Sequence, residues 1–181
     1  MSSKKDTTPK SRRRKIAEWG VQLAIAAGAV IALGAWQTRN MVASGEAAPA
    51  FSLTDLDGNR VNLSDIGDKR AVFYFFAPWC SVCHAASHKI NALREANTPD
   101  DLAKYAVGLG WETTDELRQF AEKHDLTVPV LIGDKQTAAD YRISAFPSVY
   151  ILDKTHHISH RLVGYTTELG LRARCALADI L

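Results

Sequence analysis

Cysteine is scarce in this chain of 181 residues, which has only Cys80, Cys83 and Cys175. A structural zinc site would need a second ligand pair beside the C-x-x-C pair of Cys80 and Cys83, and Cys175 has no neighbouring cysteine to complete one. The shortage of cysteine therefore argues against a zinc-binding domain. It leaves the single pair at Cys80 and Cys83 to be explained by another chemistry.

Basic residues are few outside the N-terminus. The net charge of the chain is +2, but residues 1–15 alone carry +6, so the rest of the chain carries −4. A nucleic-acid-binding domain needs a basic patch on its folded part, so we expect no nucleic acid partner. The composition, 46% hydrophobic and 23% charged, is that of one globular domain with a short appendage.

Strongly polar residues are almost absent from residues 16–36, where only Glu18 and Gln22 interrupt an apolar run. As a helix this run spans roughly 31 Å, about the thickness of the hydrocarbon core of a bilayer. Trp19 and Trp36 lie near its ends, where aromatic rings meet the headgroups, and the basic charge precedes it. We predict a basic cytoplasmic tail over 1–15 and a single-pass anchor over 16–36 in a bacterial inner membrane, with the domain facing the periplasm or the cell exterior.

A signal peptide is the alternative for this segment. Small residues around Val42-Ala43-Ser44 and at Ala47-Ala48 offer cleavage sites. The apolar cores of signal peptides usually extend over about 7–15 residues, which is shorter than the run 16–36, so we favour a retained anchor. Residues 37–48 then form a linker to a domain over 49–181. Both interpretations export the domain.

The rest of the sequence alternates between strand and helix patterns. Alternation over 51–63 around Asp57-Gly58 predicts a β-hairpin, and the apolar run Ala71 to Phe76 predicts a strand buried on both faces. This order predicts an α/β fold with a central mixed sheet flanked by helices. Further strands are predicted over 105–109, 128–132, 148–152 and 158–163, and helices over 81–96, 113–124, 138–141 and from about 167.

The pair Cys80-Ser81-Val82-Cys83 lies where the buried strand ends and a helix begins. At a helix N-terminus, free backbone N–H groups and the helix dipole stabilise a thiolate and lower its pKa. This spacing lets Cys83 reach back and resolve a mixed disulfide formed by Cys80. We predict that Cys80 is the nucleophile and that Cys83 is the shielded, resolving thiol.

Haem and copper are the alternatives for this motif. With His84 it reads C-x-x-C-H, the attachment motif of c-type haem, but the only methionines that could be distal ligands are Met1 and Met41, outside the predicted domain. A copper carrier would use Cys80, Cys83 and histidines, although histidines of this kind are mostly solvated. We favour a protein without metal or cofactor. The histidines that share a helix face or crowd one hairpin are His84, His88, His156, His157 and His160.

The segment Phe76-Ala77-Pro78-Trp79-Cys80-Ser81-Val82-Cys83 resembles the active-site segment of the thioredoxin superfamily, and it is most similar to the membrane-anchored TlpA/ResA-like branch. The hairpin over 48–64 and the segment Ala145-Phe146-Pro147-Ser148 are similar to the N-terminal hairpin and the cis-proline loop of that branch. The resemblance covers residues 47–181. It implies a thioredoxin-like fold with an N-terminal β-hairpin, preceded by one transmembrane helix.

The resemblance also implies roles for further residues. Pro147 is expected to be cis beside the cysteines and, with Phe146 and Trp79, to bind the substrate. Glu112 stands where ResA-like proteins carry a glutamate near the disulfide, from which it could shuttle the proton of Cys83. The alternative is an exposed carboxylate near a helix start, favoured by the helix dipole alone. The sequence departs from the family at Tyr74, where many thioredoxins keep a buried acid.

For function, the resemblance implies extracytoplasmic thiol–disulfide exchange, as a reductase or isomerase in preference to an oxidase. The expected partners are exported thiol or disulfide proteins and a membrane thiol protein that donates or accepts electrons. A peroxidase is a second enzymatic alternative, because the hairpin also resembles that of peroxiredoxins. It is disfavoured because Val82 and Ala85 occupy the positions that the peroxiredoxin pattern requires.

Overall fold

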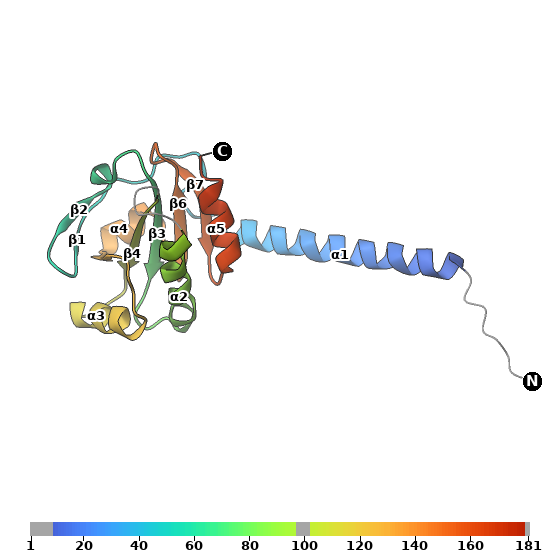
Figure 1. Ribbon diagram of the computed structural model, residues 1–181, viewed down its shortest axis with the longest axis horizontal. Helices are drawn as coiled ribbons and strands as arrows, with labels where there is room; N and C mark the ends of the chain where they lie inside the picture. The colour runs from blue at the N-terminus through green and yellow to red at the C-terminus, as the bar shows by residue number, and fades with distance from the viewer. Residues whose placement is uncertain (1–8, 97–101, 180–181) are drawn as a thin grey trace, which may run out of the picture. The chain divides into compact units, whose positions relative to one another are not determined.

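The computed structural model describes residues 9–96 and 102–179, which divide into two compact units, Met1–Gln37 and Thr38–Leu181. The described part of the first unit belongs to the helix α1, Pro9–Thr38 (Figure 1). Within α1, Ala17–Thr38 is long and apolar enough to cross a membrane, with a mean hydropathy of 1.6. The helix predicted over the apolar run is therefore confirmed.

The second unit contains a mixed sheet of seven strands in the order β2-β1-β5-β4-β3-β6-β7. The strands β3, β4 and β5 are parallel, whereas β6 pairs antiparallel with β3 and β1 antiparallel with β5. This confirms the predicted mixed α/β sheet. The strands are β1 (Ser52–Asp55), β2 (Arg60–Asn62), β3 (Arg70–Phe76), β4 (Leu102–Gly108), β5 (Val130–Ile132), β6 (Ser148–Leu152) and β7 (Ile158–Val163).

Helices cover both faces of this sheet (Figure 1). Buried side chains of α2, α3 and α5 pack on one face, and Tyr141, which follows α4, packs on the other. Both faces of the central strands are therefore buried, as the apolar run in β3 predicts. The helices are the 3-10 turn η1 (Leu63–Ile66), α2 (Ser81–Ala96), α3 (Thr114–Lys123), α4 (Lys135–Asp140) and α5 (Glu168–Ala176).

The strand β3 divides the core because its side chains alternate between the two faces. Tyr74 and Phe76 join the cluster under α2 and α3, whereas Phe73 and Phe75 join the cluster on the other face. All four are at most 1% exposed, and burial of such side chains stabilises the fold by about 1.5–3 kcal/mol each. This packing fixes the end of β3, and with it the start of α2.

The helix α4 differs from its prediction over 138–141. It begins at Lys135 because Asp134 is its N-cap, where the carboxylate accepts a hydrogen bond from the backbone N–H of Thr137. The capping side chain satisfies a free N–H group of the first turn, so the helix starts earlier than the apolar pattern indicates.

Part of the segment expected to be a linker over 37–48 packs into the second unit. Met41 and Val42 are 2% and 4% exposed and belong to the core. Arg161 donates hydrogen bonds to the carbonyl oxygens of both residues, and the hydroxyl of Tyr150 accepts one from the N–H of Val42. Further along, Ala47 pairs with His157 in an isolated β-bridge. The chain is therefore held by the folded unit from residue 41 onwards.

Candidate active site

The two cysteines lie at the junction of β3 and α2. The turn that joins β3 to α2 is closed by a hydrogen bond, 3.0 Å long, from the N–H of Cys80 to the carbonyl oxygen of Ala77. Cys80 then precedes the first residue of α2, and Cys83 lies within the first turn. Cys80 retains 7% exposure, whereas Cys83 is completely buried. This order of exposure is the one expected for an attacking and a resolving thiol.

The two sulfur atoms have different electrostatic environments. The backbone N–H of Cys83 donates to Sγ of Cys80 across 3.2 Å, so a free amide of the helix N-terminus points at this sulfur. Such a contact stabilises the thiolate form of Cys80. By contrast, burial and the neighbouring Cys80 sulfur raise the pKa of Cys83 to about 12. Cys83 is therefore a protonated thiol at neutral pH.

Tyr74 lies under Cys83. Its side chain is 1% exposed, and its hydroxyl donates a hydrogen bond to the carbonyl oxygen of Cys83, 3.1 Å away. Burial and the adjacent Cys83 raise the pKa of Tyr74 well above the usual tyrosine value, so the hydroxyl stays protonated. At the position where many thioredoxins keep a carboxyl group, this protein therefore has a permanent hydrogen-bond donor.

Trp79 directly precedes Cys80, and its ring contacts that of Phe146. The two rings meet edge to face, with 5.8 Å between the ring centres, and Trp79 is 68% exposed. The Nε1–H of Trp79 donates to the carbonyl oxygen of Gly110, 2.9 Å away. Gly110 has a positive φ of 63°, and a Cβ there would lie 3.3 Å from Nε1 of Trp79, so this position favours glycine. The Phe146–Pro147 peptide bond is cis, as the resemblance implies.

Glu112 lies in the loop between β4 and α3. It lines a cavity of about 550 Å³ that Trp79 and His84 also line, and its side chain is exposed. Cys83 is completely buried, so Glu112 and Cys83 do not share one desolvated environment. Of the two interpretations of Glu112, the structure has the exposed carboxylate near a helix start, and a part of Glu112 in the reaction stays a prediction.

The histidines do not form a metal cluster. Among the residues 9–96 and 102–179, no group of three or more His, Cys, Asp or Glu side chains could hold a metal ion. His156 contacts the carbonyl oxygen of Gly67, His157 contacts Thr155, and His160 contacts Ser159. The sequence did not indicate that His84 contacts His124, because these residues are separated by 40 positions in the chain.

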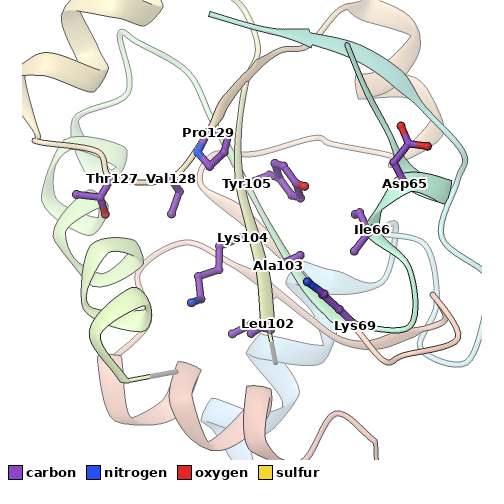
Figure 2. A pocket seen from close by; sticks show the side chains of 10 residues that line it. All are labelled: Asp65, Ile66, Lys69, Leu102, Ala103, Lys104, Tyr105, Thr127, Val128 and Pro129. Atoms are coloured by element: carbon purple, nitrogen blue, oxygen red, sulfur yellow. The ribbon is translucent and has the colours of Figure 1, made fainter. Parts of the chain in front are cut away.

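A second hollow, of about 360 Å³, lies at the other end of the sheet (Figure 2). It includes Leu102 to Tyr105, and these residues of β4 pair with the first residues of β3, far along the strand from Cys80. Leu102 and Lys104 point to one side of β4 and Ala103 and Tyr105 to the other, so the strand divides the hollow. It therefore does not form a second enclosed site.

Comparison with known proteins identifies a family and relatives of similar sequence. The model of the AhpC/TSA family matches residues 44–161. The thioredoxin-like protein YneN of Bacillus subtilis (strain 168) is 34% identical over 138 residues, which cover 75% of this chain and 81% of the relative. The thiol–disulfide oxidoreductase ResA of Geobacillus kaustophilus is 28% identical over 162 residues, covering 88% of this chain and 92% of ResA.

Solved structures support the same assignment. The crystal structure of a thiol:disulfide interchange protein DsbE from Chlorobium tepidum matches with a TM-score of 0.70 and 22% identity. The match covers 76% of this chain and 99% of that protein, and at this identity it shows the fold. The chain therefore belongs to the AhpC/TSA family, as a thioredoxin-like oxidoreductase similar to ResA.

Proposed function

We propose that this protein exchanges disulfides with exported proteins through Cys80 and Cys83. The observation that carries the proposal is the contact between the N–H of Cys83 and Sγ of Cys80 at the start of α2, with the thiol of Cys83 buried one turn further in. A stabilised thiolate and a shielded thiol at this spacing are the two groups that thiol–disulfide exchange needs.

The reaction proceeds in two steps. The thiolate of Cys80 attacks one sulfur of a substrate disulfide, forms a mixed disulfide and releases the other substrate sulfur as a thiolate. Cys83 then gives up its proton and attacks Sγ of Cys80. This step forms the Cys80–Cys83 disulfide and releases the second substrate sulfur. Trp79, Phe146 and Pro147 bind the substrate chain in this proposal, as the family resemblance implies.

The reductase or isomerase direction is the one that the family resemblance implies. Strongly oxidising members owe their high potential to a stabilised reduced form, so the measured potential decides between the two directions. A membrane thiol protein that supplies electrons completes the cycle.

The location we propose is the inner membrane, with the thioredoxin-like unit outside the cytoplasm. The apolar helix over Ala17–Thr38 and the basic charge that precedes it support this orientation. Burial of Met41 and Val42 supports a retained anchor, because cleavage near residues 43–48 would remove side chains from the core.

The proposal is tested by titrating the purified protein against glutathione redox buffers, with metal and haem analysis of the same sample. We expect one two-electron transition, a potential more reducing than that of the glutathione couple and no stoichiometric metal or haem. A chain that carries stoichiometric copper or haem, and shows no dithiol transition, would contradict the proposal in favour of a carrier.

A further inference from the structure

His84 and His124 form a pair next to the cysteines. His84 directly follows Cys83 on α2, and His124 is the C-cap of α3. Nδ1 of His84 and Nε2 of His124 are 2.5 Å apart, and both rings pack against Phe120, with 4.9 and 4.7 Å between ring centres. The histidine pair therefore joins the active-site helix to α3, and nothing in the exchange reaction described above uses it.

The hydrogen-bond network assigns the protons of the neutral pair. Nε2 of His84 lies 2.9 Å from the carbonyl oxygen of Pro78, which can only accept, so Nε2 carries a hydrogen. In a neutral ring Nδ1 of His84 is then an acceptor, and Nε2 of His124 is the donor to it. His84 thereby holds the turn that precedes Cys80, with one ring nitrogen on that turn and the other on α3.

This arrangement suits the uptake of one proton. When a proton from solvent binds Nδ1 of His124, the proton between the rings can move from Nε2 of His124 to Nδ1 of His84. The pair then holds one proton more than before, and the positive charge is on His84. A second proton would place two N–H groups against each other, so two charges on the pair are strongly disfavoured. Burial, with the charges of His84 and Lys123, lowers the pKa of His124.

The charge is well placed to act on Cys80. The N–H of His84 donates to the carbonyl oxygen of Cys80, 3.2 Å away, and Nε2 of its ring lies 2.9 Å from the carbonyl oxygen of Pro78, two residues before Cys80. A positive charge beside this turn favours the thiolate of Cys80 over its thiol. The disulfide has no charge at this position and gains nothing from it.

We infer that His84 and His124 are positioning residues for thiol exchange. Together they take up one additional proton, and its charge stabilises the thiolate of Cys80. This rests on the proposed reaction at Cys80. Reduction of the Cys80–Cys83 disulfide takes up two electrons and one proton, giving a thiolate on Cys80 and a thiol on Cys83. The histidine pair binds a second proton, which balances the charge of the thiolate.

Other charged groups surround the histidine pair. Glu112 and Glu116 line the cavity together with His84, whereas Asp125 raises and Lys123 lowers the pKa of His124. These contributions set where the pair titrates, but none of them can replace the proton shared by the two rings. The titratable and charged groups are Cys80 and Cys83 from α2 and the turn before it, Glu112 from the loop before α3, Glu116 and Lys123 from α3, and Asp125 after it.

The first test measures the rate at which iodoacetamide modifies Cys80 in the reduced full-length chain between pH 5 and 9, with the modified site mapped by mass spectrometry. In His84→Gln we expect a rate at pH 6 that is about tenfold lower than in the parent chain, with rates that converge towards pH 9 because the histidine pair then loses its added proton. His88→Gln is the matched control, since this exposed histidine lies one turn further along α2, and its profile should match the parent.

Two different failures can be distinguished. Identical pH profiles in His84→Gln and the parent chain, both reacting at Cys80, would overturn the inference about the histidine pair and leave the proposed exchange intact. If the parent chain shows no dithiol transition in the glutathione titration, that result would instead contradict the proposed function.

A second measurement needs no variant. The ¹⁵N chemical shifts of the ring nitrogens of His84 and His124 are followed against pH in the oxidised and reduced protein. We expect the two rings to titrate together, and to hold their proton to higher pH in the reduced protein. Independent titrations that are the same in both redox states would contradict the inference.

Discussion

The hydroxyl of Tyr74 donates a hydrogen bond to the carbonyl oxygen of Cys83 from beneath the active-site helix, across 3.1 Å. The ring of Tyr74 packs in the core against Phe76, with 5.9 Å between the two ring centres. A phenylalanine would keep this packing, so only the hydrogen bond to Cys83 requires the hydroxyl. The same hydroxyl also helps to lower the pKa of Cys83, against the larger effect of burial.

Replacement of Tyr74 by phenylalanine should therefore slow the second step of exchange. We expect a stability loss of about 0.5–1.5 kcal/mol in urea, typical of one buried hydrogen bond. We also expect several-fold slower resolution of a mixed disulfide at neutral pH, because the pKa of Cys83 rises further without the donor. Stopped-flow measurement of resolution against pH checks this. An unchanged rate with the expected loss of stability would make Tyr74 purely structural.

Glu112→Gln tests the proton-shuttling role that the family resemblance implies. The side chain is exposed, and water screens the interactions of exposed charges, so we expect the exchange rate to change by less than about threefold between pH 5 and 9. Glu116→Gln, on the same cavity, is the control. A tenfold loss confined to Glu112→Gln, with an altered pH profile, would establish the shuttling role instead.

Met41→Ala tests whether the chain next to the anchor belongs to the core. Met41 is 2% exposed, and removal of a buried methionine side chain typically costs about 2–5 kcal/mol. The midpoint of urea unfolding should fall accordingly, whereas Ser44→Ala, an exposed change in the same segment, should leave it unchanged. Equal midpoints for the two variants would show that residues 41–48 are a simple linker.

The topology is tested with a reporter that is active only outside the cytoplasm. Fused after residue 50, it should be active, and the mature chain should stay in the membrane fraction and still contain Trp19. A soluble mature chain that begins near residue 45 would identify the apolar helix as a cleaved signal peptide.

Local sequence patterns were enough to predict the strand β3, the helix after it and the position of the two cysteines where this helix begins. An apolar run followed by C-x-x-C determines these features over a few residues. The cis bond before Pro147 followed from the family resemblance. By contrast, the contact of His84 with His124 depends on how α2 and α3 pack, and these residues are 40 positions apart.

The burial of Met41 and Val42 could not be predicted for a similar reason. The segment 37–48 has small and polar residues without a helix or strand period, which is typical of a linker. Its place in the core depends on distant partners, since Arg161 and Tyr150 bind its backbone.

The central claim is that Cys80 attacks the substrate and Cys83 resolves the mixed disulfide. Trapping in cells tests it most directly. The full-length chain with Cys83→Ala should accumulate long-lived mixed disulfides with exported proteins, visible on non-reducing gels, because the resolving thiol is gone. Cys80→Ala should trap nothing, and Cys175→Ala, which removes a buried thiol outside the motif, should behave as the parent chain. Mixed disulfides that accumulate with Cys80→Ala and not with Cys83→Ala would contradict the assignment.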